Sequence, residues 1–234
     1  MKMVGMINGV RISALRVIQE ETKVVSFIKA LDLQPGQKIL DVGCGYGRYL
    51  QILKSNGFHA VGIERNQEIV RANTAAGLSC LHEEEFDKTR DIYDVIIMSH
   101  VIEHLNPQDL LRFLEVYLHR LKKGGHLIIA TPLLTPYFYI DFDHVKPYYP
   151  TGINMVFGSQ DSQVQYYSKH KIELVDIWFR RGPFRLFFWR GLYVKKYSSL
   201  PFYLDDLLTF LFKVSFGLIG RTTGWVGLYK KVSP

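Results

Sequence analysis

Cysteine is scarce in this chain, which has only Cys44 and Cys80 among its 234 residues. Two cysteines exclude a disulfide framework and offer no cysteine spacing typical of a structural zinc site. A chain of this length buries a core without cross-links. We therefore expect a reducing, cytoplasmic setting and two buried, unmodified thiols.

Long apolar runs are missing as well. No stretch of about 18 apolar residues occurs, which argues against a membrane-spanning helix. The first 21 residues lack a continuous apolar stretch followed by a small-residue cleavage site, so we expect no signal peptide. The chain also has no internal repeat and no low-complexity linker, and we interpret residues 1–234 as a single domain with an N-terminal helical segment at 1–35.

Acidic residues are few toward the C-terminal end. Residues 169–234 hold 12 Lys and Arg against 4 Asp and Glu, whereas residues 1–168 hold 17 against 18. The net charge of +7 therefore belongs to the last quarter of the chain, which is also aromatic and apolar. Such a mixture suits an anionic membrane surface at least as well as a nucleic-acid backbone.

Short apolar runs alternate with helical patterns from residue 36 onward. The predicted strands are 38–42, 60–63, 78–81, 94–98 and 126–130, and the predicted helices are 49–56, 67–76 and 107–123. Asn106 is placed to cap the last of these helices, and Gly124 or Gly125 to end it. This alternation predicts an α/β fold with a mostly parallel sheet, helices on both faces, and ligands at the carboxyl ends of the strands.

Three glycines in five residues follow the first predicted strand directly, at Gly43, Gly45 and Gly47. Glycines at a strand-to-helix turn let a ligand approach backbone N–H groups closely. The spacing departs from the dinucleotide fingerprint G-x-G-x-x-G, because Arg48 stands where its third glycine belongs. Glu64 follows the second strand, where a carboxylate can accept both hydroxyls of a ribose. The pattern indicates a ribose-containing ligand and weighs against NAD.

These residues and two later segments resemble the successive motifs of class I S-adenosylmethionine-dependent methyltransferases. The resemblance covers roughly residues 36–132 and is carried by the runs 39–47, 93–105 and 121–125, with Glu64 between the first two. It implies a Rossmann-like sheet of seven strands closed by an antiparallel last strand. It also implies S-adenosylmethionine as the cofactor and methyl transfer as the activity.

The resemblance assigns roles to single positions. The glycine loop would cradle the methionine end of the cofactor, Asp41 would order that loop, and Glu64 would hold the ribose. The family's usual Asp near the adenine is absent, and Glu84 or Glu83 stands in its place. The implied cofactor-binding residues are Asp41, Gly43, Cys44, Gly45, Gly47, Glu64, Arg65, Glu84, Ser99 and His100.

A zinc motif competes for part of this sequence, because residues 100–104 also fit H-x-x-E-H. Such a site needs both histidines on one helical face with a third acidic ligand nearby. Here the first histidine, His100, ends a strand, and a new helix starts at Pro107. We therefore expect no metal, and interpret His104 as a packed, hydrogen-bonded histidine under the cofactor.

The acceptor side is expected in residues 133–181. His144 has a carboxylate next to it in sequence, Asp143, and is our candidate for acceptor binding or for the general base. A backbone hydrogen bond explains this histidine about equally well. Further candidate acceptor residues are His104, Tyr137, Lys146 and Tyr148.

About forty residues separate the predicted sixth strand, 171–179, from the predicted closing strand, 224–231. Within this insertion, 182–223, large apolar side chains alternate with Arg and Lys, and 205–219 is predicted to be a helix with a wide apolar face. An acceptor lid, a homodimer interface, a peripheral membrane anchor and an extra packed layer all remain open. Phe and Trp interleaved with Arg favour the membrane or a lipid-linked acceptor.

Taken together, the sequence predicts an S-adenosylmethionine-dependent methyltransferase. We expect it to act on an oxygen of a small or lipid-linked acceptor, in the cytoplasm or at the inner face of a membrane. An RNA methyltransferase is the alternative that the basic charge supports, but no Asn/Asp-Pro-Pro-Tyr motif follows the fourth strand, and we expect no DNA partner. A catalytically silent cofactor-binding scaffold is the third interpretation, which the intact glycine loop disfavours.

Overall fold

The computed structural model describes residues 19–158, 163–186 and 200–232. The chain divides into two compact units. The first, which we call the core unit, comprises residues 20–179 and 224–234. The second, the insertion unit, comprises residues 1–19 and 180–223. The two units are described separately below.

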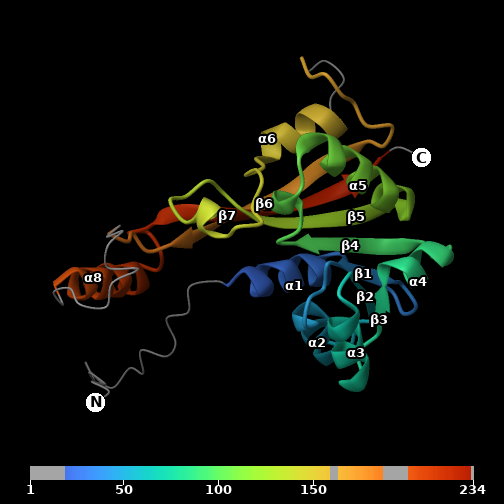
Figure 1. Ribbon diagram of the computed structural model, residues 1–234, viewed down its shortest axis with the longest axis horizontal. Helices are drawn as coiled ribbons and strands as arrows, with labels where there is room; N and C mark the ends of the chain where they lie inside the picture. Colours follow the sequence, from blue (N-terminus) through green and yellow to red (C-terminus); the bar gives the residue numbers. More distant parts are fainter. Residues whose placement is uncertain (1–18, 159–162, 187–199, 233–234) are drawn as a thin grey trace. The chain divides into compact units, whose positions relative to one another are not determined.

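Seven strands form one sheet in the order β3-β2-β1-β4-β5-β7-β6 (Figure 1). Strands β1 to β5 pair in parallel, and β7 pairs antiparallel with β5. This topology confirms the predicted fold class, including the antiparallel closing strand. The strands are β1 (Ile39–Val42), β2 (Ala60–Glu64), β3 (Cys80–His82), β4 (Tyr93–Ser99), β5 (Leu121–Pro132), β6 (Ile172–Gly182) and β7 (Arg221–Lys231).

Helices connect the strands and cover both faces of the sheet, as predicted (Figure 1). The α-helices are α1 (Glu20–Ala30), α2 (Arg48–Ser55), α3 (Gln67–Ala75), α4 (Glu83–Lys88), α5 (Pro107–His119), α6 (Pro150–Ile153) and α8 (Leu200–Val214). Short turns of other helix types are η2 (Ile102–His104), η3 (Phe138–Ile140) and η4 (Asn154–Gly158).

Two apolar layers enclose the sheet. Ile28 of α1 packs in one layer with Ile97 of β4, whereas Leu114 of α5 packs in the other with Ile96 of the same strand. Successive side chains of a strand point to opposite faces. Since both faces of β4 are covered, the strand is a continuous apolar run, which is why its sequence signal is strong.

The predicted boundary between the helix at 107–123 and the strand at 126–130 is wrong. Helix α5 begins where expected, since Asn106 Oδ1 accepts hydrogen bonds from backbone N–H groups of the first turn at 3.0 and 3.1 Å. The helix ends at His119, however, and β5 already starts at Leu121 rather than at residue 126. Lys122 Nζ lies 2.7 Å from Oδ1 of Asp94 on the neighbouring strand β4, and this ion pair holds the segment at the sheet.

The insertion unit contains the predicted helix at a shifted position. Helix α8 covers Leu200–Val214 instead of 205–219, because the backbone turns left-handed at Phe216 (φ 53°) and Gly217 (φ 85°). Arg181 secures this turn by donating to Gly217 O and Gly220 O, each at 2.7 Å. The aromatic residues of 187–199 and the N-terminal residues 1–18 lie outside the described residues. No helix in the described part of the chain is both long and apolar enough to cross a membrane.

Candidate active site

The glycine loop between β1 and α2 has the backbone that its sequence requires. Gly43, Gly45 and Gly47 have φ values of 68°, 49° and 69°, a left-handed region that residues with a Cβ rarely adopt. The N–H groups of Gly43 and Cys44 donate to Ile63 O at 2.9 and 3.0 Å, which ties the loop to the end of β2. A Cβ on Gly45 would meet nothing within 4 Å, so the loop is open to a ligand at this position.

Asp41, at the end of β1, is buried with 1% of its surface exposed. Its Oδ2 has no hydrogen-bond partner within the described part of the chain. Burial, with a smaller contribution from Cys80, raises the pKa of Asp41 to about 8. A buried carboxyl oxygen without a partner fits a donor supplied by a ligand, such as the positively charged methionine end of the cofactor.

Glu64 joins the glycine loop to the next helix. Gly45 N–H donates to Glu64 Oε2 at 3.1 Å, and Asn66 N–H donates to Glu64 Oε1 at 2.9 Å. Each carboxylate oxygen has two lone pairs, so acceptors remain for ribose hydroxyls. The neighbouring candidates Arg65 and Glu84 are both exposed, and Glu84 lies in the first turn of α4. Their roles toward a cofactor stay predictions.

Cys44 and Cys80 are buried and free, as predicted. Their Sγ atoms lie 3.5 Å apart, and Asn73 Nδ2 donates to Gly45 O at 2.8 Å beside them. The hydrogen bond from Cys44 lowers the pKa of the Cys80 thiol to about 7, although burial opposes this shift, and the same bond raises the pKa of Cys44. The Cys44 side chain thus packs beneath the loop, while its backbone N–H is already bonded to Ile63 O.

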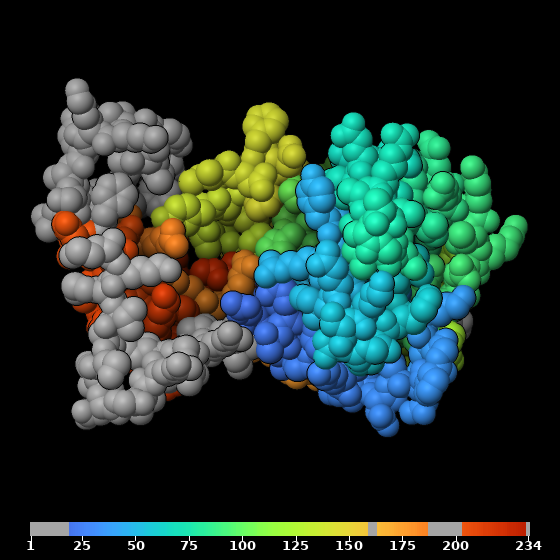
Figure 2. Space-filling model, turned by 90° about the horizontal axis from the view of Figure 1, so that it is seen from below, coloured from blue at the N-terminus to red at the C-terminus, as the bar shows by residue number. Residues whose placement is uncertain are grey.

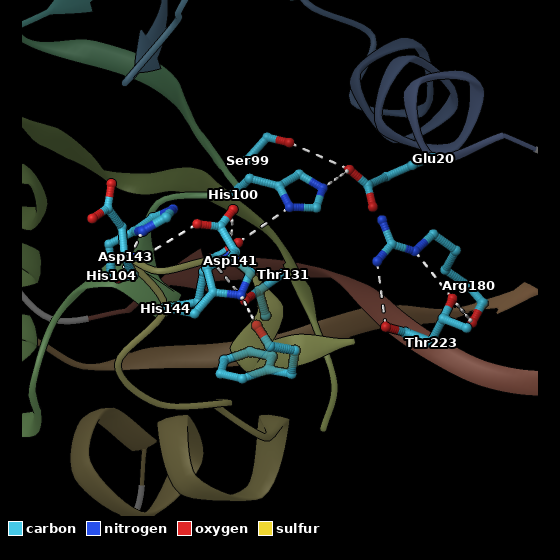
Figure 3. Close-up of polar contacts among 12 residues, drawn as sticks. Glu20, Ser99, His100, His104, Thr131, Asp141, Asp143, His144, Arg180 and Thr223 are labelled. Carbon is cyan, nitrogen blue, oxygen red and sulfur yellow. Dashed lines mark hydrogen bonds and ion pairs between the residues drawn. The ribbon is translucent and has the colours of Figure 1, made fainter. Parts of the chain in front are cut away.

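Polar residues at the end of β4 form a network with α1 (Figure 3). Ser99 Oγ and His100 Nε2 lie 3.3 and 3.1 Å from the same oxygen of Glu20, and His100 Nδ1 lies 3.1 Å from Glu103 Oε1. His100 has a φ of 56°, a costly conformation for a residue with a side chain. The two carboxylates hold the ring in this position.

The charge of His100 follows from these contacts. Burial disfavours the imidazolium, but hydrogen bonds and ion pairs with Glu103 and Glu20 outweigh it and raise the pKa of His100 to about 9. The imidazole is therefore protonated at neutral pH, and both ring nitrogens donate to carboxylates.

Glu20 was not predicted from the sequence, and Glu103 was noted only within the methyltransferase-like run 93–105 and the H-x-x-E-H motif. The only local signal at Glu20 is a pair of acids in the first turn of α1, which is typical of a helix start. Its partner His100 is 80 positions away, so no sequence pattern connects the two.

His104 and His144 come together on the acceptor side (Figure 3). Their ring centres are 4.9 Å apart, with an edge-to-face arrangement. His104 Nδ1 lies 3.1 Å from Asp143 O, and His144 Nδ1 lies 2.8 Å from Phe138 O. His144 Nε2 is 3.6 Å from Asp141 Oδ2. His144 thus has the backbone hydrogen bond that was its alternative explanation, and His104 is hydrogen-bonded as predicted.

The other candidate acceptor residues differ in accessibility. Tyr148 is buried, its hydroxyl donates to Leu105 O at 2.8 Å, and its carbonyl accepts from Trp225 Nε1 at 2.8 Å, so these contacts anchor it in the core. Lys146 is exposed, with its Nζ 5.4 Å from the centre of the Tyr148 ring. Tyr137 is half-buried at the start of η3. Roles of these residues toward an acceptor stay predictions.

The strand order, the glycine loop and the acid after β2 define a class I methyltransferase fold. The chain belongs to the methyltransferase domain family, whose match covers residues 16–181. S-adenosylmethionine is the cofactor that this family and fold imply, and Asp41, Glu64 and the open glycine loop fit it. A SAM dependent methyltransferase from Archaeoglobus fulgidus shares the fold, with a TM-score of 0.57 and 18% identity over 90% of this chain and 92% of that chain.

Two relatives of known activity match up to half of the sequence. Phosphoethanolamine N-methyltransferase 1 of Zea mays is 35% identical over 126 residues, which are 50% of this chain and 24% of the relative. The mitochondrial ubiquinone biosynthesis O-methyltransferase of Homo sapiens is 32% identical over 108 residues, 41% of this chain and 29% of the relative. The chain thus matches less than a third of the length of either protein.

Proposed function

We propose that this chain transfers a methyl group from S-adenosylmethionine to an oxygen atom of a small or lipid-linked acceptor. The observation that carries the proposal concerns Glu103. This residue links the end of β4, where we expect the cofactor, to the loop that bears His144. The backbone oxygen of Glu103 accepts from Val145 N at 2.8 Å and Lys146 N at 3.2 Å. The carboxylate of the same residue holds His100 at the end of β4.

S-adenosylmethionine, when bound, supplies the methyl group on its sulfonium. A hydroxyl acceptor arrives protonated, so it needs a group that takes its proton or weakens its O–H bond. Because Phe138 O only accepts, the Nδ1 of His144 carries a hydrogen, and Nε2 keeps a lone pair in the neutral ring. We assign His144 to acceptor binding or proton removal, with Tyr137 and Lys146 as further acceptor contacts.

The relatives support a small acceptor. One is a phosphoethanolamine N-methyltransferase and the other a ubiquinone biosynthesis O-methyltransferase. The histidine pair favours O-methylation over N-methylation, because a hydroxyl acceptor gains more from a positioned base.

An apolar stripe on α8 supports contact with a membrane. Tyr203, Leu207, Phe210 and Val214 follow helical spacing and are 40–66% exposed. Lys213, on the same helix, is exposed as well, and the C-terminal quarter carries a basic excess. Apolar side chains beside basic ones suit the surface of an anionic bilayer.

Methyl transfer is tested with purified protein, tritium-labelled S-adenosylmethionine and three acceptor pools: small phenols and amines, a lipid extract, and RNA. We expect label in the phenols or the lipid extract. His144→Ala should lower turnover by about 10²–10⁴ with unchanged affinity for S-adenosylhomocysteine, whereas His119→Ala on α5 should behave like the wild type. Label in RNA alone would establish the alternative function. Cofactor binding without transfer to any pool would favour the scaffold interpretation.

Membrane contact is tested by co-sedimentation with anionic phospholipid vesicles at low and high salt. We expect binding that falls as salt rises, since each basic residue near the surface adds about 1 kcal/mol of attraction that ions screen. Leu207→Ser with Phe210→Ser should reduce binding, whereas Val116→Ser, which changes an equally exposed residue of α5, should not. A protein that stays in the supernatant at low salt, as a dimer or a monomer, would refute the membrane proposal.

A further inference from the structure

Three side chains of metal-ligand type converge on the acceptor side of the core unit. They are Glu103 and His104 at the end of η2 and His144 in the loop after η3. One ligand atom from each lies within 4.8 Å of the other two. A tetrahedral cation with bonds of about 2.1 Å needs its ligands about 3.4 Å apart, so side-chain shifts of about 1 Å close the site.

The hydrogen bonds of the two histidines leave one ring nitrogen of each for a metal. His104 Nδ1 contacts Asp143 O and His144 Nδ1 contacts Phe138 O, and both partners are carbonyl oxygens that only accept. Each Nδ1 therefore carries a hydrogen, and each neutral ring keeps the lone pair of its Nε2. A metal-binding histidine commonly donates its other N–H to a backbone carbonyl in this way, because the bond fixes the tautomer and the ring orientation.

The third ligand, Glu103, is likewise held in place. The residue is fully buried, and its two carboxylate oxygens receive hydrogen bonds from His100 Nδ1 at 3.1 Å and Thr131 Oγ1 at 3.0 Å. One lone pair on each oxygen remains for a cation. The backbone of Glu103 also binds the N–H groups of Val145 and Lys146, which fixes the loop that bears His144.

We infer that Glu103, His104 and His144 bind one divalent transition-metal cation. Two imidazoles and one carboxylate suit zinc, manganese, iron, cobalt or nickel better than magnesium or calcium, which prefer oxygen ligands throughout. Three protein ligands leave coordination positions open, and Asp141, 3.6 Å from His144 Nε2, lies beside them.

This site differs from the one that the sequence motif suggests. The H-x-x-E-H run offers His100 and His104 as a pair, but His100 is bonded to Glu20 and Glu103 and serves to orient the carboxylate. His144, from a different segment, takes the place of the second histidine. The expectation of no metal rested on the lack of a shared helical face, and the fold supplies the missing ligand from the loop instead.

The inference deepens the proposed function and rests on it only for the role of the cation. A cation at this site would bind the acceptor oxygen in an open position and lower the pKa of its hydroxyl, so that the proton leaves to water before methyl transfer. His144 would then hold the acceptor through the cation instead of removing the proton itself.

The test is equilibrium dialysis of the chelator-treated full chain against Co²⁺ and, separately, Zn²⁺, with the metal measured by mass spectrometry. We expect one tightly bound ion per chain, and visible absorption bands of Co²⁺ with nitrogen and oxygen ligands. His104→Ala and His144→Ala should each weaken binding on the order of 100-fold. The matched control is His119→Ala, since His119 and His170 form another histidine pair, with ring centres 6.2 Å apart.

Circular dichroism of each variant shows whether it folds, and Glu103→Gln, of equal size, provides a further variant for the same measurement. No ion bound by the folded wild type, or equal binding by the wild type and the folded His104→Ala and His144→Ala variants, would overturn the inference. Methyl transfer measured in parallel separates the two proposals. Full activity of the metal-free protein would show that the reaction does not need the cation, and the proposed function would stand. Metal binding without any methyl transfer would support the metal site and refute the proposed function.

Discussion

Replacing Glu64 by alanine removes the carboxylate that we assign to the ribose of the cofactor. The side chain also accepts from Gly45 N at 3.1 Å and from Asn66 N at 2.9 Å, so the change frees the glycine loop as well. A hydrogen bond to a charged group contributes about 1.5–3 kcal/mol. We expect the dissociation constant for S-adenosylhomocysteine to rise between about tenfold and a hundredfold. Glu64→Gln, which keeps one acceptor oxygen without the charge, should fall between alanine and the wild type.

Isothermal titration calorimetry with S-adenosylhomocysteine measures this loss. Glu68→Ala is the matched control, because Glu68 is an exposed acid of the first turn of α3 and its side chain has no assigned role. Thermal unfolding of all four proteins shows whether weaker binding reflects lost contacts to the ligand or loss of the folded state. Equal dissociation constants for the wild type and a folded Glu64→Ala variant would refute the assignment of Glu64.

Three other changes test the glycine loop, the start of strand β4 and the contact between α1 and His100. Gly47→Ala puts a Cβ 2.6 Å from the nearest side-chain atom at a φ of 69°, so urea unfolding should show a loss of about 1–3 kcal/mol, and an unchanged midpoint would contradict the tight turn. Burial opposes ionisation of Asp94, but hydrogen bonds from Lys122 and other donors hold its pKa below the usual value. The ionised Asp94 therefore stabilises the fold above about pH 4, and this stabilisation is lost as the pH falls through the lowered pKa of the folded state. Asp94→Asn should therefore cost about 2 kcal/mol in urea unfolding at pH 7 and progressively less as the pH falls below about 4, and a pH-independent cost would contradict this account. Glu20→Gln should lower the pKa of His100 from about 9, as followed by NMR titration of the imidazole, and an unchanged pKa would remove Glu20 from the network.

Much of the sheet was predictable from local sequence. Strand β4 is buried on both faces, so it reads as an uninterrupted apolar run. The glycine loop was predictable because Gly43, Gly45 and Gly47 adopt backbone angles that other residues disfavour. The start of α5 followed from Asn106, whose side chain caps the helix within its own first turn. In each case the cause lies within a few residues of its effect.

The remainder depends on contacts between distant residues. The end of α5 was misplaced because Lys122 is held by Asp94, a partner 28 positions earlier that no helix signal reports. Likewise, His144 lies beside His104, and the backbone oxygen of Glu103 binds the two residues that follow His144. The contacts among the polar residues of the site could therefore be found only in the tertiary structure, whereas the glycine loop could be predicted from the sequence.

Calorimetric titration of the purified chain with S-adenosylhomocysteine, and separately with NADH, tests the central claim most directly. We predict one site per chain with a micromolar dissociation constant for S-adenosylhomocysteine, roughly −7 to −8 kcal/mol, and no heat of binding for NADH. Binding of NADH together with no binding of S-adenosylhomocysteine would contradict the assignment of the glycine loop and Glu64 to a methyltransferase cofactor.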